Sequence, residues 1–162
     1  AGMASGTASE DMTLEEWDKI IRLNLTGSFL VSREVGKHMI SRRYGKIINT
    51  CSMQGIRCTM GMPGTPYNTS KGGDIMMVRS LAAEWAQYGI TVNGIGPGYF
   101  PTDIDKEYLA TDYFKGQLAM HCPMGRIGRD GELNGVLIYF ASDASSYTTG
   151  QIMYVDGGWT LV

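Results

Sequence analysis

The sequence predicts an α/β fold in which helices cover both faces of a doubly wound parallel sheet. Apolar runs of strand length alternate with longer segments of helical periodicity, and each run is apolar along its whole length. Strands of that kind are buried on both faces, and their alternation with helices requires parallel crossover connections. The 162 residues, 43% of them hydrophobic, are enough to bury a core within one domain.

The first helix is expected from about Thr13 into the thirties. Thr13 and Glu16 form a capping box, the usual start of a helix. Apolar positions then recur at helical spacing along one face, which we expect to be buried. The members of this face are Leu14, Trp17, Ile21, Leu25 and Ser28.

The first strand is predicted at residues 46–51, a short apolar run. Residues 52–66 hold too many glycines and prolines for regular structure, so we expect a loop there. A long helix is predicted over residues 67–88. Pro66 is placed at its start and Gly89 at its C-terminal stop.

The rest of the chain completes an α-β-α-β-α-β order. A second strand is predicted at residues 90–95, and residues 99–122 have a weaker helical pattern suited to a mobile lid. A helix over 133–140 and a strand over 150–156 follow. Three strands make a narrow sheet for a doubly wound fold, so we expect about half of the sheet to be absent from this chain.

Composition excludes several classes of partner. The net charge is −2 and no run of Lys or Arg occurs, which argues against nucleic acid or an anionic membrane as a partner. The three cysteines form no C-x-x-C pair, so neither a metal site nor a disulfide framework is expected. Within these residues neither a signal-peptide pattern nor an apolar stretch of ~18 residues occurs, so nothing here marks export or membrane spanning. We therefore expect a cytoplasmic protein with a small-molecule ligand.

Tyr67 and Lys71 form the first candidate for chemistry. They stand four apart in a predicted helix, so their side chains share a face about one turn apart. An ammonium group near a phenol favours the phenolate, which makes Tyr67 a candidate general acid and base. A tyrosine and a lysine at this spacing also occur on ordinary solvated helix faces, so the pair alone does not show that Tyr67 is catalytic.

Two further polar residues give that pair a context. Ser52 follows the predicted strand 46–51 at its carboxyl end, where open α/β sheets bind ligands, and its hydroxyl could hold a carbonyl oxygen. Asn24 lies close to the apolar face of the first helix, where its amide needs hydrogen-bond partners. Spacing leaves two roles open for Asn24, a structural one and that of anchoring a water that relays protons.

Four motifs in order resemble those of the short-chain dehydrogenase/reductase family, over essentially the whole chain. They are Asn-Leu-Thr-Gly at 24–27, Ser52, Tyr-Asn-Thr-Ser-Lys at 67–71 and Pro-Gly-Tyr-Phe-Pro-Thr at 97–102, with Asp-Gly-Gly at 156–158 near the terminus. The resemblance implies a Rossmann-like fold. It also implies hydride transfer between a substrate carbon and NAD or NADP.

The resemblance assigns roles by position. It implies that Tyr67 is the catalytic acid and base, that Ser52 orients the substrate oxygen, and that Asn24 holds the proton-relay water. Lys71 would bind the nicotinamide ribose and lower the pKa of the tyrosine, and substrate would contact Ser52 and Tyr67. The cofactor-binding residues implied in this way are Tyr67, Lys71, Pro97, Gly98, Phe100 and Thr102.

One family motif is missing. The glycine-rich turn T-G-x-x-x-G-x-G after the family's first strand does not occur in this chain, and Ala1-Gly2 resembles the end of its N-N-A-G motif. The resemblance therefore implies that residues 1–162 are the C-terminal, catalytic and substrate-binding portion of a single Rossmann-like domain. The residues that distinguish NAD from NADP would lie in the missing half.

The resemblance is strongest to members that act on sugar acids and polyols, such as gluconate 5-dehydrogenase. It rests on residues 52–55, 83–90 and 156–160. A 3-oxoacyl-carrier-protein reductase shares every catalytic motif and is the alternative enzyme.

Family members commonly assemble through their long helices, so a homotetramer packed through helices 13–40 and 67–88 is expected. A non-catalytic oligomerisation module derived from the family is the alternative of another class.

Overall fold

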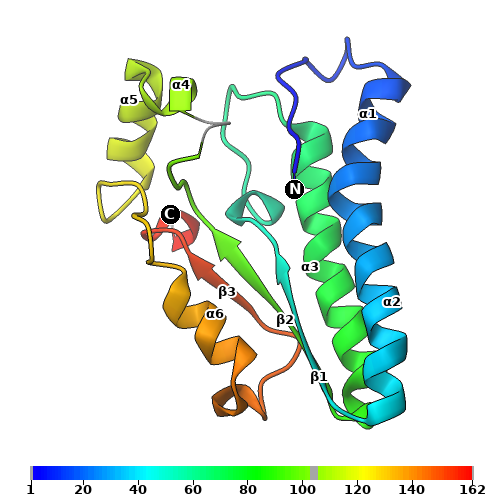
Figure 1. The fold of residues 1–162 in the computed structure, drawn as a ribbon. Coiled ribbons are helices and arrows are strands. Elements are labelled where there is room, and N and C mark those ends of the chain that lie inside the picture. The colour runs from blue at the N-terminus through cyan, green and yellow to red at the C-terminus, as the bar shows by residue number, and fades with distance from the viewer. Residues whose placement is uncertain (1, 103–105, 162) are drawn as a thin grey trace.

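The computed structural model describes residues 2–102 and 106–161, and within them a parallel sheet has the order β1-β2-β3. The strands are β1 (Gly45–Thr50), β2 (Ile90–Pro97) and β3 (Ile152–Val155). Gly45 pairs with Ile90 at the start of β1, and Gly94 pairs with Ile152 at the start of β3. All three strands therefore direct their carboxyl ends to the same edge of the sheet (Figure 1).

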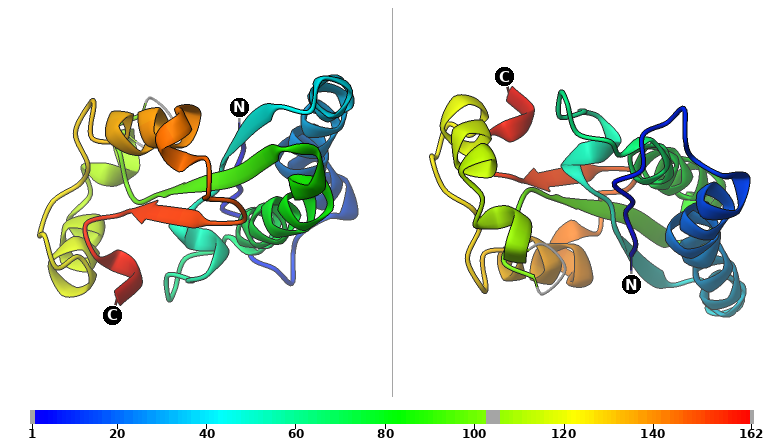
Figure 2. Two further views of the ribbon diagram at one scale, coloured as in Figure 1. Left: turned by 90° about the horizontal axis from the view of Figure 1, so that it is seen from below. Right: turned by 90° about the horizontal axis from the view of Figure 1, so that it is seen from above.

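Helices cover both faces of this sheet, as predicted. The long helix α3 (Thr65–Trp85) lies on one face and α6 (Asn134–Ala141) on the other (Figure 2). Strand alternation explains the two cores. Ile47 and Val92 pack with α3, whereas Ile48 and Ile95 pack on the other side.

The core against α3 is the larger of these two. It joins Val78, which is fully buried, to Val92 of β2, and Ile75, Leu81 and Ala82 extend it along the helix. Burying an aliphatic side chain of this size contributes roughly 1.5–3 kcal/mol. This packing holds α3 against the sheet.

The predicted first helix is divided by a wide turn. It consists of α1 (Leu14–Ile21), a π-helical segment (Arg22–Thr26) and α2 (Gly27–Arg42). Periodicity of 3.6 residues predicts one regular helix, and it cannot show the extra residue that a π turn inserts. Thr13 caps α1 as expected, accepting a hydrogen bond from the Glu16 amide.

The predicted buried face of that helix is wrong at its start. Leu14 is largely exposed, and the deeply buried positions are Ile20, Asn24, Ser32 and Gly36. The helix lies against α3 through small and polar residues along much of its length, so an apolar stripe does not mark its buried side.

The loop between β1 and α3 contains one short 3-10 helix (Met53–Gly55), which the count of glycines and prolines did not predict. Pro66 lies in the first turn of α3, as expected. A 3-10 turn (Ala86–Tyr88) follows this helix. Gly89 then ends it in the left-handed region with φ of 73°.

The segment after β2 forms two short helices, α4 (Lys106–Leu109) and α5 (Asp112–His121). Residues 103–105 of the expected lid lie outside the described residues. Short 3-10 helices follow α6 (Asp143–Ser145) and close the chain after β3 (Trp159–Leu161). In the described residues, no helix is both long and apolar enough to cross a membrane.

Candidate active site

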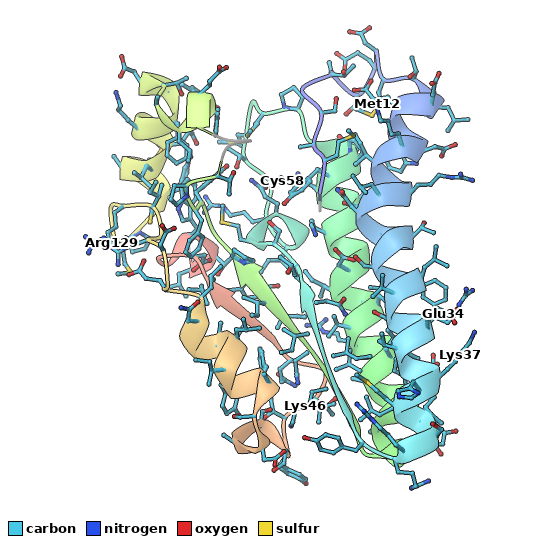
Figure 3. The ribbon with its side chains drawn as sticks, in the orientation of Figure 1. Met12, Glu34, Lys37, Lys46, Cys58 and Arg129 are labelled. Carbon is cyan, nitrogen blue, oxygen red and sulfur yellow. The ribbon has the colours of Figure 1, made fainter. Side chains whose placement is uncertain are left out.

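A cavity of about 660 Å³ opens at the carboxyl edge of the sheet. Its walls come from the N-terminal segment, the end of β1, the loop before α3, the first turns of α3 and the loop after β2. Figure 3 shows Cys58 on the loop before α3, near this edge. The cavity brings together seven of the predicted site residues, Ser52, Tyr67, Lys71, Pro97, Gly98, Phe100 and Thr102.

Ser52 is placed by the end of β1. The backbone stays extended through Ser52, and its Oγ accepts a hydrogen bond of 3.1 Å from the Gln54 amide at the start of the 3-10 helix. A serine hydroxyl that accepts in this way still has its own proton to donate. Ser52 is buried and lines the cavity, so that proton can serve a ligand oxygen there.

Tyr67 lies in the first turn of α3, and Lys71 lies one turn later on the same face. Both line the cavity. Lys71 is 7% exposed, and its Nζ donates a 2.8 Å hydrogen bond to the carbonyl oxygen of Thr50, the last residue of β1. The lysine therefore joins α3 to the carboxyl end of the strand that carries Ser52.

Asp74, which sequence analysis did not single out, is the second partner of Lys71. Lys71 Nζ donates to Asp74 Oδ2 at 3.0 Å, and the carboxylate is 1% exposed. Burial raises the pKa of Asp74, and the Lys71 charge opposes that rise. Burial and then the Asp74 charge raise the pKa of the Cys51 thiol to about 12, so Cys51 stays neutral beside the pair.

The loop after β2 reaches the cavity through Pro97 and Gly98. The Gly98 amide donates to the Val155 carbonyl at 3.0 Å, which carries the β2–β3 ladder to the end of the sheet. A Cβ on Gly98 would lie 2.7 Å from the Asp156 Cα, so only glycine allows this approach. Phe100 and Thr102 then continue along the cavity wall.

Asn24 lies behind the cavity wall and is not among its lining residues. Its Oδ1 accepts from the Met3 amide at 2.9 Å, and its Nδ2 donates to the Met3 carbonyl at 2.9 Å and to Ser70 Oγ at 3.0 Å. The buried amide is thus satisfied within the chain. Asn24 positions the N-terminal segment, and its role toward a relay water stays a prediction.

Several cavity residues were missed by sequence reasoning. The π-helical segment that buries Asn24 leaves no periodic signal. Residues 2–5 line the wall, and the contacts that hold this segment, of Met3 with Asn24 and of Ser5 and Thr7 with Glu16, join residues far apart in the sequence. Gln54 stands two residues after Ser52, and Asn68 is the second residue of the Tyr67 motif, so both could have been found by that proximity. Polar lining residues to which sequence reasoning gave no role include Asn49, Gln54, Thr59 and Asn68.

The arrangement is suited to proton transfer at a carbon–oxygen bond. Ser52 supplies a hydroxyl donor, Tyr67 a phenol, and Lys71 a positive charge one helical turn from the phenol. A preorganised donor and a nearby charge stabilise an oxygen that becomes negative in the transition state. No group of three or more His, Cys, Asp or Glu side chains within residues 2–102 and 106–161 is arranged to hold a metal ion.

A protein-family model described as enoyl-(acyl carrier protein) reductase matches residues 1–160. Gluconate 5-dehydrogenase of Gluconobacter oxydans is 35% identical over 162 residues, covering 99% of this chain and 62% of that protein. NADP-dependent mannitol dehydrogenase of Alternaria alternata is 39% identical over 161 residues, covering 99% and 59%.

A solved structure has the same fold along the whole chain. The crystal structure of gluconate 5-dehydrogenase from Burkholderia cenocepacia, in complex with NADP and tartrate, has a TM-score of 0.95 and 38% identity. The alignment covers 100% of this chain and 63% of that one. This chain therefore spans less than two thirds of the length of each of these three relatives.

Proposed function

The chain belongs to the short-chain dehydrogenase/reductase family, and on that premise we propose that it acts in hydride transfer between a nicotinamide cofactor and a sugar acid or polyol. The substrate carbon would alternate between a carbonyl and a secondary alcohol. One observation carries the proposal: Ser52, Tyr67 and Lys71 line a single cavity with Pro97 and Gly98.

Each polar residue has a distinct task in this proposal. When a carbonyl is reduced, Tyr67 donates its phenolic proton to the substrate oxygen, and Ser52 donates a hydrogen bond to that same oxygen. Lys71 stabilises the phenolate that Tyr67 leaves behind. In the oxidation direction Tyr67 accepts the alcohol proton. The nicotinamide supplies or accepts the hydride when it is bound.

The lining residues fit a nicotinamide nucleotide. Thr50 and Asp74 accept two of the three Lys71 N–H groups, which leaves one for a ribose hydroxyl. Gly98 lies so close to Asp156 that no side chain fits at this position, so the end of β2 stays free of one. Pro97, Gly98, Phe100 and Thr102 would hold the carboxamide end. We propose NAD or NADP, and NADP is tested first because a relative was solved with it.

Amide and hydroxyl side chains within the cavity lining support a polyhydroxylated substrate. Gln54 Nε2 donates to Thr59 Oγ1 and to the Tyr99 hydroxyl, both at 3.3 Å, and Asn68 of α3 also lines the cavity. These amides and hydroxyls can exchange hydrogen bonds with sugar hydroxyls. An acyl chain has no hydroxyl groups to exchange hydrogen bonds with these side chains, so we propose sugar acids and polyols ahead of 3-oxoacyl thioesters.

The test uses the protein produced from its own gene. Oxidation of gluconate and mannitol is followed by nicotinamide absorbance with NADP and then NAD, and reduction of 5-ketogluconate is followed with NADPH and then NADH. Tyr67→Phe should lower kcat by at least about 100-fold, the usual range for loss of a general acid. The matched control is Tyr147→Phe, at a fully exposed tyrosine, and it should keep the wild-type rate.

Two other variants divide the remaining roles. Ser52→Ala should lower kcat by about 100-fold through loss of the oxygen contact, and Lys71→Met should also weaken cofactor binding. Turnover of 3-oxoacyl thioesters alone would favour the reductase alternative. Cofactor binding without turnover of any tested substrate would leave the substrate class wrong, and no cofactor binding would favour the non-catalytic module.

We also propose a homotetramer assembled through the long helices. Apolar side chains on α2 are exposed in the single chain, and Met76 of α3 is exposed as well. Burial of such groups drives subunit association. Light scattering would test the subunit number, and a monomer would exclude it. The exposed apolar side chains of α2 are Phe29, Leu30, Val31 and Val35.

A cytoplasmic setting is proposed for the same protein. Cys51, Cys58 and Cys122 are all free, as is usual for proteins of reducing compartments. Fractionation of cells that express the native gene would test this setting.

A further inference from the structure

A buried carboxylate lies next to the lysine of the candidate site. Asp74 follows Lys71 by three residues on α3, and the two form an ion pair of 3.0 Å with side chains 1% and 9% exposed. Its second oxygen, Oδ1, is buried and has no hydrogen-bond partner among the described residues. The neighbouring residues of the same helix face, Ile75 and Val78, belong to the apolar core.

If the ion pair served only to stabilise the fold, its burial would be unfavourable in free energy. A carboxylate removed from water loses several kcal/mol of hydration, and a buried ion pair often contributes no net stability over apolar residues of the same volume. The unpartnered oxygen adds to that cost. An apolar residue at position 74 would pack in the core without this cost. Stability therefore does not explain the carboxylate, and its effect on Lys71 is the alternative explanation.

The ion pair restricts the direction in which the Lys71 side chain points. Thr50 and Asp74 accept two of the three Lys71 N–H groups from fixed positions, one at the end of β1 and one on α3. The third N–H is left for the cavity, which Lys71 lines. A four-carbon side chain that would otherwise sample several rotamers is therefore held in one.

The ion pair also changes the electrostatic potential in the cavity. Tyr67 and Asp74 lie seven residues apart on α3, roughly 10 Å along the helix axis, with Lys71 between them. The negative charge of Asp74 offsets part of the field of Lys71 at Tyr67. The other titratable group close to Asp74 is Cys51 at the end of β1, and its thiol is neutral.

We propose that Asp74 is a positioning residue that holds the Lys71 ammonium in place and moderates its effect on the Tyr67 phenol. This inference rests on the proposed dehydrogenase function. Asp74 itself does not touch substrate or cofactor, because it is absent from the cavity lining.

Asp74→Asn separates charge from geometry, because its amide oxygen still accepts a hydrogen bond from Lys71. With the negative charge gone, Lys71 favours the phenolate more strongly. The acid limb of the kcat/KM profile for alcohol oxidation should therefore move down by about one pH unit, the effect of one charge roughly 10 Å away at an effective dielectric constant of about 20. The kcat at the optimum should stay within about threefold.

Asp74→Leu removes both charge and acceptor, so Lys71 loses its anchor. We expect kcat to fall by at least about tenfold, and the cofactor KM to rise. The matched control is Asp112→Asn, which breaks an exposed Lys115–Asp112 pair of the same three-residue spacing. It should change neither the pH profile nor kcat.

A second measurement needs no cofactor and no turnover. In protein with ¹³Cζ-labelled tyrosine, the Tyr67 resonance is assigned by its loss in Tyr67→Phe, and its pKa is compared between wild type and Asp74→Asn. A lower Tyr67 pKa in the variant supports the proposal, and an equal or higher one overturns it. If the wild type has no activity while this difference is present, the proposed function fails and the positioning role stands.

The wild type alone gives a third outcome, which does not depend on any variant folding. The Asp74 carboxyl ¹³C resonance should have the shift of a carboxylate at neutral pH. A protonated Asp74 at neutral pH would overturn the proposal, because an uncharged side chain cannot offset the charge of Lys71.

Discussion

Gly36 of α2 lies directly against the indole of Trp85 of α3. A Cβ on Gly36 would lie 2.5 Å from Trp85 Cη2 and 2.8 Å from Cζ3, closer than two carbon atoms can approach. The two helices therefore come together at the far end of α3 from the cavity through a glycine and the largest side chain available. This contact lets α2 approach the C-terminal end of α3 closely.

The contact predicts the effect of one methyl group. Gly36→Ala should lower the free energy of unfolding by up to about 2 kcal/mol, because overpacking costs about 1–3 kcal/mol and the gain in helix propensity is roughly 1 kcal/mol. Gly135→Ala is the matched control, since a Cβ there meets open space on α6. Denaturant unfolding should show the control equal to or more stable than wild type. Two equally stable variants would contradict the packing argument.

Asn24 should anchor the N-terminal segment. Asn24→Ala leaves the Met3 amide and carbonyl without their partner, so we expect a loss of about 1–3 kcal/mol and faster hydrogen exchange at Met3. Asn134→Ala, at an exposed position of α6, should change stability by less than about 0.5 kcal/mol. Unchanged exchange at Met3 in Asn24→Ala would show that the segment is held by other contacts.

The three cysteines should differ in reactivity. Cys58 is exposed, whereas Cys51 and Cys122 are buried, and the pKa of Cys51 is raised to about 12 by burial and by Asp74. At about pH 8 the native protein should react with one equivalent of a disulfide reagent, and Cys58→Ser should abolish that reaction. Unfolded protein should react at all three. Reaction of native Cys58→Ser would mean that the packing around Cys51 or around Cys122 opens readily.

Glu132 predicts a pH dependence of stability. Its hydrogen bonds from Arg126 and from the Arg129 amide lower its pKa from 4.5 to about 2. A lowered folded-state pKa contributes stability above about pH 4.5, and that contribution is lost as the pH falls toward 2. The difference in unfolding free energy between wild type and Glu132→Gln should be constant above about pH 5 and shrink below it. A difference that grows on acidification would contradict this assignment.

Local signals predicted the sheet and most of its cover. Continuous apolar runs placed β1, β2 and β3 to within two residues at each end. Gly89 ends the 3-10 turn that follows α3, so the predicted stop holds for the helical segment as a whole, although α3 itself ends at Trp85. Prediction from local signals fails where a residue's neighbours come from segments that are distant in the sequence. Leu14 was expected in the core and is exposed, because the first helix packs through Ile20 and small residues.

The residues of the candidate site also divide into those that local signals identified and those that they did not. Ser52, Tyr67 and Lys71 could be identified because they stand at a strand end and at a four-residue helical spacing, both of which are properties of short segments. Asp74 has no such mark in the sequence, since an acidic residue three positions after a lysine is common on exposed helix faces. Its importance appears only when burial and the unpartnered oxygen are known.

The sequence by itself determined the parallel α/β order, the carboxyl edge that gathers the polar residues, and the pairing of a tyrosine with a lysine on one helix face. Each follows from backbone periodicity, which acts over a few residues. Only the tertiary structure decided that Asn24 bonds to Met3, that Gly36 meets Trp85 and that Asp74 is buried beside Lys71. Burial and hydrogen-bond partners depend on which distant segments pack together, and no local pattern specifies that choice.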